Sequence, residues 1–354
     1  MFSLSYAGIG RDNIEMLHFC TYFDHRYLPH GLALCESLRR HCPNFRLWVL
    51  CLSEACHESL EELALEEIRP IKLGAFEEGD DELHAAKQNR SIVEYYFTCT
   101  SSLPLYIFRT QPDVTMVTYV DADLFFFSDP APLFTELGGN SIGIIPHRFP
   151  DSLRHMEANG IFNVGWLTFR QDERGLACLR WWRDRCIEWC YDRRESGRFA
   201  DQKYLDDWPR RFEGVAVLEH KGANVASWNL SNYGYEEKGR EVLVDGQPLI
   251  FFHFHHLKRL RAWLFETALL LYKARLNPVL KRRVFAPYLK AVEKERSVVA
   301  RLLTPARGQE VIRQDPTGSS ERRSMFSDSL RQAHQFWRDL RAQRKLIYIW
   351  GRVL

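Results

Sequence analysis

Residues 117–127 read VTYVDADLFFF, a β-branched and aromatic run that carries two aspartates. This composition predicts a buried strand that delivers Asp121 and Asp123 at its far end, before a turn at Ser128-Asp129-Pro130. Because side chains two apart on a strand point to the same side, the two carboxylates can converge on one point. Neighbouring carboxylates repel unless a cation lies between them, and oxygen ligands suit Mg²⁺ or Mn²⁺ with positions left for phosphate oxygens. The stretch therefore predicts a metal-diphosphate site, although an isolated Asp-x-Asp is more often a solvated turn.

The composition describes a globular chain of 354 residues, long enough for one large α/β domain with an appendage, or for two domains. The net charge of +2 conceals an asymmetry, since residues 257–354 hold 22 Lys/Arg against 8 Asp/Glu and residues 1–256 hold 26 against 38. Nine cysteines without a Cys-x-x-Cys pair argue against a disulfide framework and indicate a reducing compartment. No signal segment and no uncharged apolar run of about 18 residues occurs, so we expect a cytoplasmic protein without a membrane span.

The first part of the chain alternates between predicted strands and helices. Strands are expected at 16–23, 45–52 and 68–73, with helices at 28–41 and 54–67, and this alternation predicts a parallel sheet. The sequence lacks a Gly-x-Gly-x-x-Gly after the first strand and a P-loop, which argues against a dinucleotide-binding dehydrogenase or a P-loop NTPase. Ligands of open α/β sheets lie at the carboxyl ends of strands, so the first strand and its turn supply candidate nucleotide contacts: Thr21, Tyr22, Asp24 and Tyr27. For Asp24, a helix cap is an equal alternative.

The middle of the chain adds further polar candidates. Residues 80–108 have a helical pattern interrupted at Pro104, and Arg90 could reach a diphosphate or pair with Glu94 one turn later. A strand at 159–169 follows another at 141–146, and its start holds Asn163 and Gly165; glycine there lets a ligand or another chain approach the backbone. The aromatic face of a helix at 176–193 indicates core packing.

The later part of the body carries polar groups at predicted element ends. Asp201 and Gln202 begin a predicted helix, where a carboxylate is also a good cap. Residues 222–229 form a loop suited to carbohydrate, with Asn224 to bond hydroxyl groups and Trp228 to stack on a sugar ring. A strand at 248–258 places His253 and His255 on one face, where a histidine could complete the metal shell or could be a core residue. Lys258 could hold phosphate.

Taken together, five short motifs between residues 16 and 258 resemble the GT-A-type nucleotide-sugar glycosyltransferases, especially the family of glycogenin and the bacterial lipooligosaccharide galactosyltransferases (family 8-like). The motifs are Thr-Tyr-x-Asp-x-x-Tyr, Tyr-Val-Asp-Ala-Asp, Phe-Asn-x-Gly, Asp-Gln and His-x-x-x-x-Lys. The resemblance implies a GT-A fold, with a single mostly parallel central sheet flanked by helices. It also implies metal-dependent transfer of a sugar, with retention, from a nucleotide-diphosphate sugar, UDP-sugar foremost. The acceptor would be a saccharide or glycolipid of surface polysaccharide synthesis.

The resemblance also implies roles for individual residues. The metal ligands for Mn²⁺ or Mg²⁺ would be Asp121, Asp123 and His253. Donor contacts would come from Thr21, Tyr22, Asp24, Tyr27, Arg90, Ala122 and Lys258. Asn163 and Gly165 would line the acceptor side, joined by Asn224 and Trp228, with Asp201 and Gln202 beside the anomeric carbon. The family's closing motif is His-x-x-Gly-x-x-Lys, but here His256 stands at the glycine position and Lys258 comes one residue early, so the choice between His253 and His255 as ligand stays open.

The C-terminal part, 259–354, is predicted to be a basic helical extension of a catalytic domain at 1–258, with helices over 259–303, a linker at 304–320 and a basic helix at 331–354. Interleaved basic and aromatic residues predict attachment to the inner face of an anionic membrane, where a lipid-linked acceptor would be met. Packing against the body or a second subunit is the alternative, and the oligomeric state stays open. Nucleic acid is not an expected partner, because the body has no recognition motif. Two other functions compete: a sugar nucleotidyltransferase, and a carbohydrate-binding or scaffold protein that retains the fold.

Overall fold

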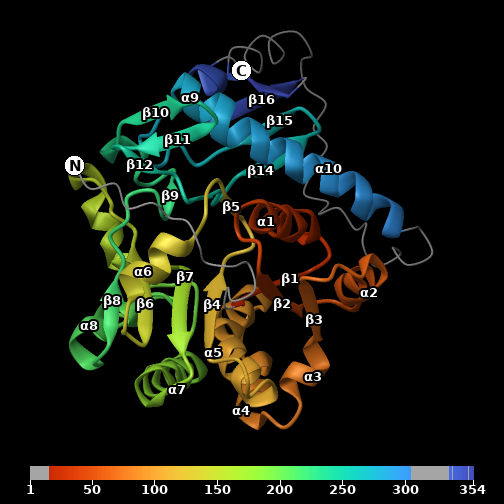
Figure 1. Cartoon of the computed structure of the whole chain (residues 1–354), viewed down its shortest axis with the longest axis vertical. Helices are drawn as coiled ribbons and strands as arrows, with labels where there is room; N and C mark the ends of the chain where they lie inside the picture. The colour runs from red at the N-terminus through yellow and green to blue at the C-terminus, as the bar shows by residue number, and fades with distance from the viewer. Residues whose placement is uncertain (1–15, 304–334, 337, 350) are drawn as a thin grey trace, which may run out of the picture.

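A seven-stranded sheet forms the centre of the protein (Figure 1). In spatial order its strands are β3 (Ile68–Lys72), β2 (Phe45–Cys51), β1 (Leu17–Phe23), β4 (Met116–Val120), β7 (Phe162–Arg170), β6 (Ile142–Pro146) and β8 (Val215–Val217). Within this sheet β7 runs antiparallel to both of its neighbours, and the other pairings are parallel. The predicted α/β class with a mostly parallel central sheet is confirmed.

The computed structural model describes residues 16–303, 335–336, 338–349 and 351–354. The predicted linker at 304–320 lies outside these residues. Within the described part of the chain, no helix combines the length and the apolar character that a membrane crossing needs.

Helices cover both faces of the central sheet (Figure 1). One face packs against α1 (Leu28–His41) and α2 (Glu54–Leu63), and the other against α5 (Ile92–Thr110) and α7 (Glu173–Glu188). On α5 the buried residues Tyr95, Cys99, Leu103 and Ile107 recur every fourth position, which places one apolar stripe against the sheet. The shorter helices are α3 (Leu73–Glu77), α4 (Asp81–Gln88), α6 (Ala131–Leu137) and α8 (Trp208–Arg211).

The predicted helical stretch 80–108 is two helices, α4 and α5, and the break comes before Ser91. Ser91 and Glu94 form a capping box, in which the Ser91 backbone N–H donates to Glu94 Oε2 at 2.9 Å. The expected interruption at Pro104 is wrong, since α5 continues through it to Thr110. A proline removes one helical hydrogen bond, and the buried stripe on both sides of it outweighs that loss.

A second, three-stranded sheet joins β5 (Leu124–Phe126), β13 (Phe251–His253) and β9 (Val225–Ala226). The predicted strand 117–127 is therefore two strands, β4 in the large sheet and β5 in the small one. Asp121-Ala122-Asp123 is the crossing between them, and His253 pairs with Leu124 directly after it. The crossing brings the two aspartates and the histidine together although they are far apart in sequence.

The C-terminal part differs most from its prediction. The helix expected at Arg259–Leu276 is wrong, because the chain forms a hairpin of β14 (Lys258–Arg261) and β15 (Leu264–Glu266) followed by turns. The helices that follow are α9 (Pro278–Leu280), a π-helical turn (Lys281–Phe285) and α10 (Ala286–Leu302). Where the structure describes the predicted helix at 331–354, residues 335–336 and 338–341 are helical as predicted. The rest is not, since β16 (Lys345–Ile349) pairs with β15, and β17 (Arg352–Val353) pairs with β16.

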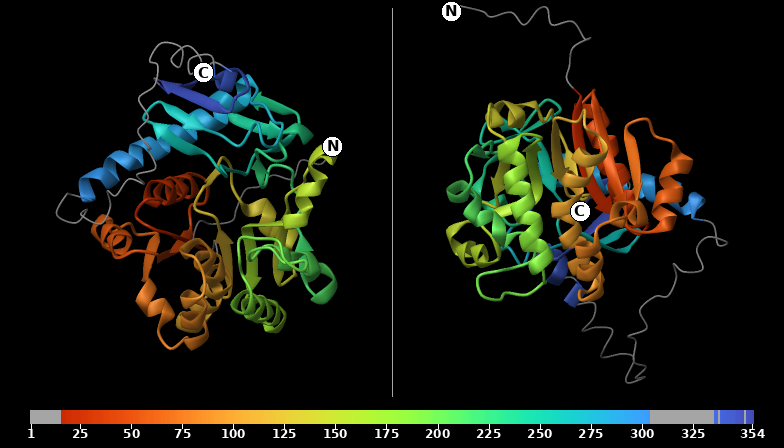
Figure 2. Two further views of the ribbon diagram at one scale, coloured as in Figure 1. Left: turned by 180° about the vertical axis from the view of Figure 1, so that it is seen from behind. Right: turned by 90° about the horizontal axis from the view of Figure 1, so that it is seen from below.

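The C-terminal elements lie together at one end of the molecule, beside a hairpin of β10 (Tyr235–Lys238), β11 (Glu241–Val244) and the short β12 (Gln247–Pro248) (Figure 1). Seen from behind, α10 lies across α1 (Figure 2), and Lys294 of α10 pairs with Glu36 of α1 at 3.2 Å. One apolar cluster includes Phe252 of the body as well as Phe285 and Leu346 of the C-terminal part. The described tail thus packs on the body, while the domain boundary at residue 258 stays a prediction.

Candidate active site

The carboxyl ends of β1 and β4 open into a cavity of 350 Å³. The predicted residues that line it come from three separate segments: Tyr22, Asp24 and Tyr27; Asp121, Ala122 and Asp123; and His253. The other lining residues are Phe23, Leu52, Tyr96, Phe97, Tyr119 and His255. The turn after the first strand, the Asp-x-Asp crossing and the closing histidine therefore meet at one place.

Each aspartate of the crossing has one oxygen bonded to a tyrosine and another oxygen directed toward His253. Tyr119 donates to Asp121 Oδ1 at 2.9 Å, and Tyr27 donates to Asp123 Oδ2 at 3.3 Å. The Nε2 atom of His253 lies 3.1 Å from Asp123 Oδ1 and 3.5 Å from Asp121 Oδ2. The tyrosines fix the orientation of both carboxylates, so two oxygens and one ring nitrogen converge.

Burial and charge act against each other within this cluster. Burial raises the pKa of Asp121 above its ordinary value despite the opposing His253. Burial also disfavours a charged Asp123, but His253 outweighs it and holds the pKa of Asp123 well below its usual range. In turn, Asp123 more than offsets the effect of burial on His253 and raises its pKa. Positive charge beside the two carboxylates is thus strongly stabilised.

These donors fit a divalent cation. Carboxylate oxygens and an imidazole nitrogen are ordinary ligands of Mn²⁺, and Mg²⁺ accepts the carboxylates. Asp123, His253 and His255 each offer one ligand atom, and these atoms all lie within 4.8 Å of one another. Burial and the nearby His253 lower the pKa of His255 to about 3, which leaves its ring neutral. The structure thus brings Asp121, Asp123 and His253 together, with His255 close by, and their role as metal ligands stays a prediction.

Gly165 provides space for His253, not for a ligand. A Cβ atom at Gly165 would come within 2.9 Å of the His253 ring and 2.5 Å of Asn163 Oδ1. That Asn163 oxygen accepts from the Gly165 N–H at 3.0 Å, and the Asn163 amide lies 3.2 Å from His147 Nε2. Neither residue lines the cavity. The close approach predicted from this glycine is made by the chain's own histidine.

Asp201 is buried close to the cavity without lining it. The helix predicted to begin there is a 3₁₀ segment (Lys203–Asp207). Its N-cap residue is Gln202, so Asp201 does not cap it. Burial raises the pKa of Asp201 to about 7, with hydrogen bonding from Thr100 acting against it and the charge of Asp121 adding to it. Gln202 donates to the Asn159 carbonyl at 3.1 Å and packs against Gly160, away from the cavity.

The raised pKa of Asp201 predicts a specific pH dependence of stability. The native state holds an extra proton between the ordinary pKa of 3.8 and about 7, so stability is lost as pH rises through this window. The slope is about 1.4 kcal/mol per pH unit. We expect that the free energy of unfolding of Asp201→Asn does not show this decrease between pH 5 and pH 8, measured by urea unfolding at both pH values. The control Asp151→Asn, at a side chain that is 92% exposed, should keep the parent's slope, and an unchanged slope in Asp201→Asn would contradict the assignment.

Of the other predicted donor residues, Asp24 and Arg90 have structural partners, whereas the Thr21 hydroxyl has none among the described residues. Thr21 is fully buried in the sheet. Asp24 lines the cavity, but its Oδ1 atom accepts from the backbone N–H groups of Arg26 and Tyr27, at 2.9 and 3.1 Å, and so shapes the turn before α1 instead of serving as its N-cap. Arg90 donates to Thr98 Oγ1 and to the Ile187 carbonyl, both at 2.6 Å. It therefore neither reaches the cavity nor pairs with Glu94, so both predicted contacts of Arg90 are absent from the structure.

The remaining predicted residues lie near the cavity without lining it. The ring of Trp228 meets those of His253 and His255 edge to face, with centroids 5.1 and 5.6 Å apart. Asn224 is buried and donates to the Pro146 carbonyl at 3.2 Å. Lys258 is exposed and lines a neighbouring cavity of 400 Å³ together with His256. His256 has a φ of 57°, so it adopts the left-handed conformation that the family's glycine would adopt with less strain.

Sequence reasoning missed four aromatic residues of the cavity: Phe23, Tyr96, Phe97 and Tyr119. Tyr119 stands two residues before Asp121, so strand alternation could have placed it on the same side. Tyr96 and Phe97 belong to α5, whose helical pattern gave no sign that this part of the helix turns toward the carboxyl ends of the strands.

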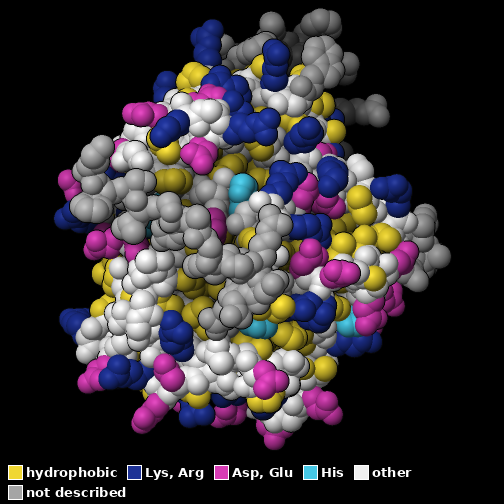
Figure 3. Space-filling model, viewed as in Figure 1, with side chains coloured by type: hydrophobic (Ala, Val, Ile, Leu, Met, Phe, Trp, Pro, Cys, Tyr) yellow, Lys and Arg dark blue, Asp and Glu magenta, His cyan; other side chains and the backbone are white. Residues whose placement is uncertain are grey.

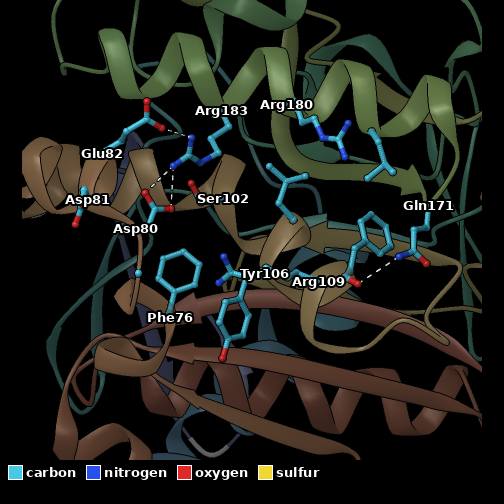
Figure 4. A pocket seen from close by; sticks show the side chains of 14 residues that line it. Phe76, Asp80, Asp81, Glu82, Ser102, Tyr106, Arg109, Gln171, Arg180 and Arg183 are labelled. Carbon is cyan, nitrogen blue, oxygen red and sulfur yellow. Dashed lines mark hydrogen bonds and ion pairs between the residues drawn. The ribbon is translucent and has the colours of Figure 1, made fainter.

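A larger cavity of 670 Å³ lies between α4, α5 and α7 and contains none of the predicted site residues (Figure 4). Arg183 points from α7 toward α4 and bonds to Asp80 at 2.7 Å and Glu82 at 2.8 Å. Gln171 bonds to the Phe108 carbonyl at 3.3 Å. Because the guanidinium of Arg183 is used in ion pairs within the protein, size alone does not make this cavity the functional site.

Comparison with known proteins adds relatives and fold neighbours. The chain is 34% identical over 244 residues to the uncharacterized protein YfnD of Bacillus subtilis (strain 168), covering 68% of this chain and 78% of YfnD. It is 32% identical to the uncharacterized protein YfnF of the same organism, covering 67% and 80%. No family model matches.

Two solved structures that are similar to this chain are those of glycosyltransferases. One is the galactosyltransferase LgtC in complex with donor and acceptor sugar analogs, with 17% identity, a TM-score of 0.49, and coverage of 81% of this chain and 97% of LgtC. Another is the apo form of the glycosyltransferase GlyE of Streptococcus pneumoniae TIGR4, with 15% identity, a TM-score of 0.48, and coverage of 81% and 63%.

Proposed function

This chain belongs to the family of the uncharacterized proteins YfnD and YfnF of Bacillus subtilis, and from that premise we propose that it is a metal-dependent glycosyltransferase. The donor is a nucleotide-diphosphate sugar, UDP-sugar foremost, and the acceptor is a saccharide or a lipid-linked saccharide of surface polysaccharide synthesis. Transfer proceeds with retention of configuration at the anomeric carbon.

One observation carries this proposal: two carboxylates oriented by tyrosines face a single imidazole at the wall of an aromatic cavity. Asp121 Oδ2 lies 3.5 Å and Asp123 Oδ1 lies 3.1 Å from His253 Nε2. A carboxylate pair of this kind suits a cation that also binds phosphate oxygens. A cation alone would not need the aromatic cavity beside it, whereas a nucleotide would.

The cavity wall offers the chemistry that a nucleoside needs. The rings of Tyr22 and Tyr96 lie 6.3 Å apart, and with Phe97 and Leu52 they form an apolar surface for a base. Asp24 uses Oδ1 for its own turn, so its second oxygen is directed to accept a hydrogen bond from a base or ribose. These residues would bind and orient the nucleoside while Asp121 and Asp123 face the diphosphate.

The reaction requires stabilisation of the leaving group. A divalent cation bound at Asp121, Asp123 and His253 would neutralise the charge that grows on the nucleoside diphosphate as the anomeric bond breaks. The tyrosine hydroxyl groups of Tyr27 and Tyr119 hold the two carboxylates in place throughout. Lys258, in the neighbouring cavity, is proposed as a further diphosphate contact.

Residues next to the cavity are proposed for the sugar and the acceptor. Asp201 is assigned to the side of the anomeric carbon, and Asn224 and Trp228 to the acceptor side. Gln202 is instead bonded to the Asn159 carbonyl, and Gly165 with Asn163 accommodates the His253 ring. Thr21 and Arg90 are best described as structural, because one is inside the sheet and the other is bonded within the helical layer.

Sugar release from nucleotide sugars tests the function directly. Incubation with UDP-, GDP- and CMP-sugars should liberate free sugar in the presence of Mn²⁺, and excess chelator should stop it. Binding without release would favour the carbohydrate-binding or scaffold alternative. Formation of a nucleotide sugar from a sugar phosphate and a nucleoside triphosphate would favour the nucleotidyltransferase.

Attachment to an anionic membrane is proposed through the hairpin β14–β15 and the turn after it, not through a terminal helix. Leu260, Trp263, Leu270 and Leu271 are between 42% and 59% exposed there, and Lys258, Arg261 and Lys273 lie among them. Lys and Arg gather over the end of the molecule formed by the C-terminal elements (Figure 3). Exposed apolar side chains beside basic ones match an anionic lipid surface.

Vesicle flotation tests this attachment. We expect the parent chain to float with phosphatidylglycerol-containing vesicles and not with pure phosphatidylcholine, and the double variant Leu270→Ser, Leu271→Ser to lose flotation. The control Ile92→Ser, Val93→Ser removes side chains that are 66% and 48% exposed on another surface and should float like the parent. Equal flotation of both double variants would contradict the proposed surface.

A further inference from the structure

His255 offers a second imidazole at the candidate metal site. Its ring lines the same cavity as Asp121, Asp123 and His253. Its ligand atom belongs to the set with Asp123 and His253 in which all atoms lie within 4.8 Å of one another. Metal–ligand bonds of about 2.2 Å place two opposite ligands about 4.4 Å apart. The spacing of Asp123, His253 and His255 therefore needs only a small contraction around a cation. Asp121 lies outside this set, but its Oδ2 atom is 3.5 Å from His253 Nε2, so it would join the site by a further small shift.

The backbone fixes which way His255 points. Phe254 is buried and stacks on Tyr288, with ring centroids 3.6 Å apart, on the side of the C-terminal core. Its backbone N–H donates to the Asp123 carbonyl at 3.0 Å, which ties this segment to the Asp-x-Asp crossing. His253 at the end of β13 and His255 in the turn that follows it both line the cavity.

The surroundings of His255 leave its ring nitrogens available. Trp228 meets His253 and His255 edge to face and so limits where both rings can move. Among the described residues, His255 contacts its neighbours through its ring face and edge, and the described side chains offer it no hydrogen-bond partner. A partly buried imidazole at the wall of a carboxylate-bearing cavity is a ready nitrogen ligand.

We propose that His255 is a fourth ligand, which gives a site of two carboxylates and two imidazoles that selects Mn²⁺ over Mg²⁺. This inference rests on the proposed function and goes beyond it, because a site of two carboxylates and one imidazole would discriminate far less between Mn²⁺ and Mg²⁺. Mg²⁺ prefers oxygen ligands and keeps several waters, whereas imidazole favours the transition metals. The second imidazole is thus the specificity-determining residue of the site.

The test compares two neighbouring histidines. His255→Asn shortens the side chain so that it cannot reach the metal, and His256→Asn is the matched control, because His256 is exposed, lines the adjacent cavity, and has a φ of 57° that asparagine tolerates. Binding of Mn²⁺ is measured from the electron paramagnetic resonance signal of the free ion, and Mg²⁺ binding by competition. Pulsed measurements on bound Mn²⁺ count the coordinated nitrogens.

We expect His255→Asn to weaken Mn²⁺ binding by about 10- to 100-fold. Loss of a group that only hydrogen-bonds to a metal ligand already weakens binding by this much, so loss of a ligand should weaken it at least as much. Mg²⁺ binding should change much less, so the preference for Mn²⁺ falls, while His256→Asn keeps it. The parent should show two coordinated nitrogens and His255→Asn one.

Three results would overturn the inference: one coordinated nitrogen in the parent chain, which needs no variant to fold, equal loss of Mn²⁺ and Mg²⁺ binding in His255→Asn, or Mn²⁺ affinity in His255→Asn like that of the parent. If the parent binds no Mn²⁺ at all, the proposed metal site itself fails. Parent-like Mn²⁺ affinity in His255→Asn removes only the fourth ligand.

Discussion

Asp123→Ala should abolish metal-dependent sugar transfer and release. Asp123 accepts from Tyr27 with one oxygen and faces His253 with the other at 3.1 Å, so its loss removes a ligand and leaves His253 without its nearest anion. Losing one preorganised contact to a developing negative charge costs about 100- to 1000-fold in rate. We expect at least this loss, measured as free sugar released from the best donor at saturating Mn²⁺.

The matched control is Asp129→Ala, six residues later on the same segment. Asp129 is exposed and bonds only to the Ala131 backbone N–H at 2.8 Å among the described residues, so its replacement should leave the rate near that of the parent. Full activity of Asp123→Ala, or of the parent chain in excess chelator, would contradict the assignment of the metal site.

Gly165→Ala should disable the same site without touching a ligand. Its Cβ would lie 2.9 Å from the His253 ring and 2.5 Å from Asn163 Oδ1, so the ring has to move out of line with the two aspartates. Displacing a group by about 1 Å can cost about 100-fold in rate. We expect a loss of this size together with weaker Mn²⁺ binding, measured on a variant whose circular dichroism matches the parent.

Gly139→Ala is the control for Gly165→Ala, because a Cβ at Gly139 meets nothing within 4 Å. It should keep the parent's rate and Mn²⁺ affinity. If Gly165→Ala does the same, the close packing of the backbone against His253 has no part in holding the metal site.

Local sequence patterns predicted the core of the fold well. The helix expected at 28–41 is α1 (Leu28–His41), and the strand expected at 45–52 is β2 (Phe45–Cys51). In both elements, the face that the spacing of apolar residues predicts to be buried is the face that the structure buries. The prediction for the C-terminal part was wrong. Arg259–Leu276 has apolar residues at helical spacing, but β15 within this range pairs with β16, far away in sequence, and this pairing stabilises strands. Such a partner cannot be read from a local pattern.

The residues of the candidate site likewise form two groups: those that sequence patterns placed and those whose contacts depend on distant parts of the chain. Asp121, Asp123 and His253 were predicted from motifs, and the structure places one oxygen of each aspartate within 3.5 Å of His253 Nε2. Arg90 and Gly165 were different, because their partners decide what they do. The Ile187 carbonyl lies 97 residues from Arg90, and the His253 ring fills the space beside Gly165. A charged or small residue predicts that a contact is available. Only the folded structure shows whether another part of the same chain already makes that contact.

The central claim is that Asp121, Asp123 and His253 hold a divalent cation to which the donor's diphosphate binds. Calorimetric titration of the full chain with UDP, once in Mn²⁺ and once in excess chelator, tests it most directly. The account predicts saturable binding of UDP in Mn²⁺ and loss of that binding in chelator. Equal affinity in both conditions would contradict it.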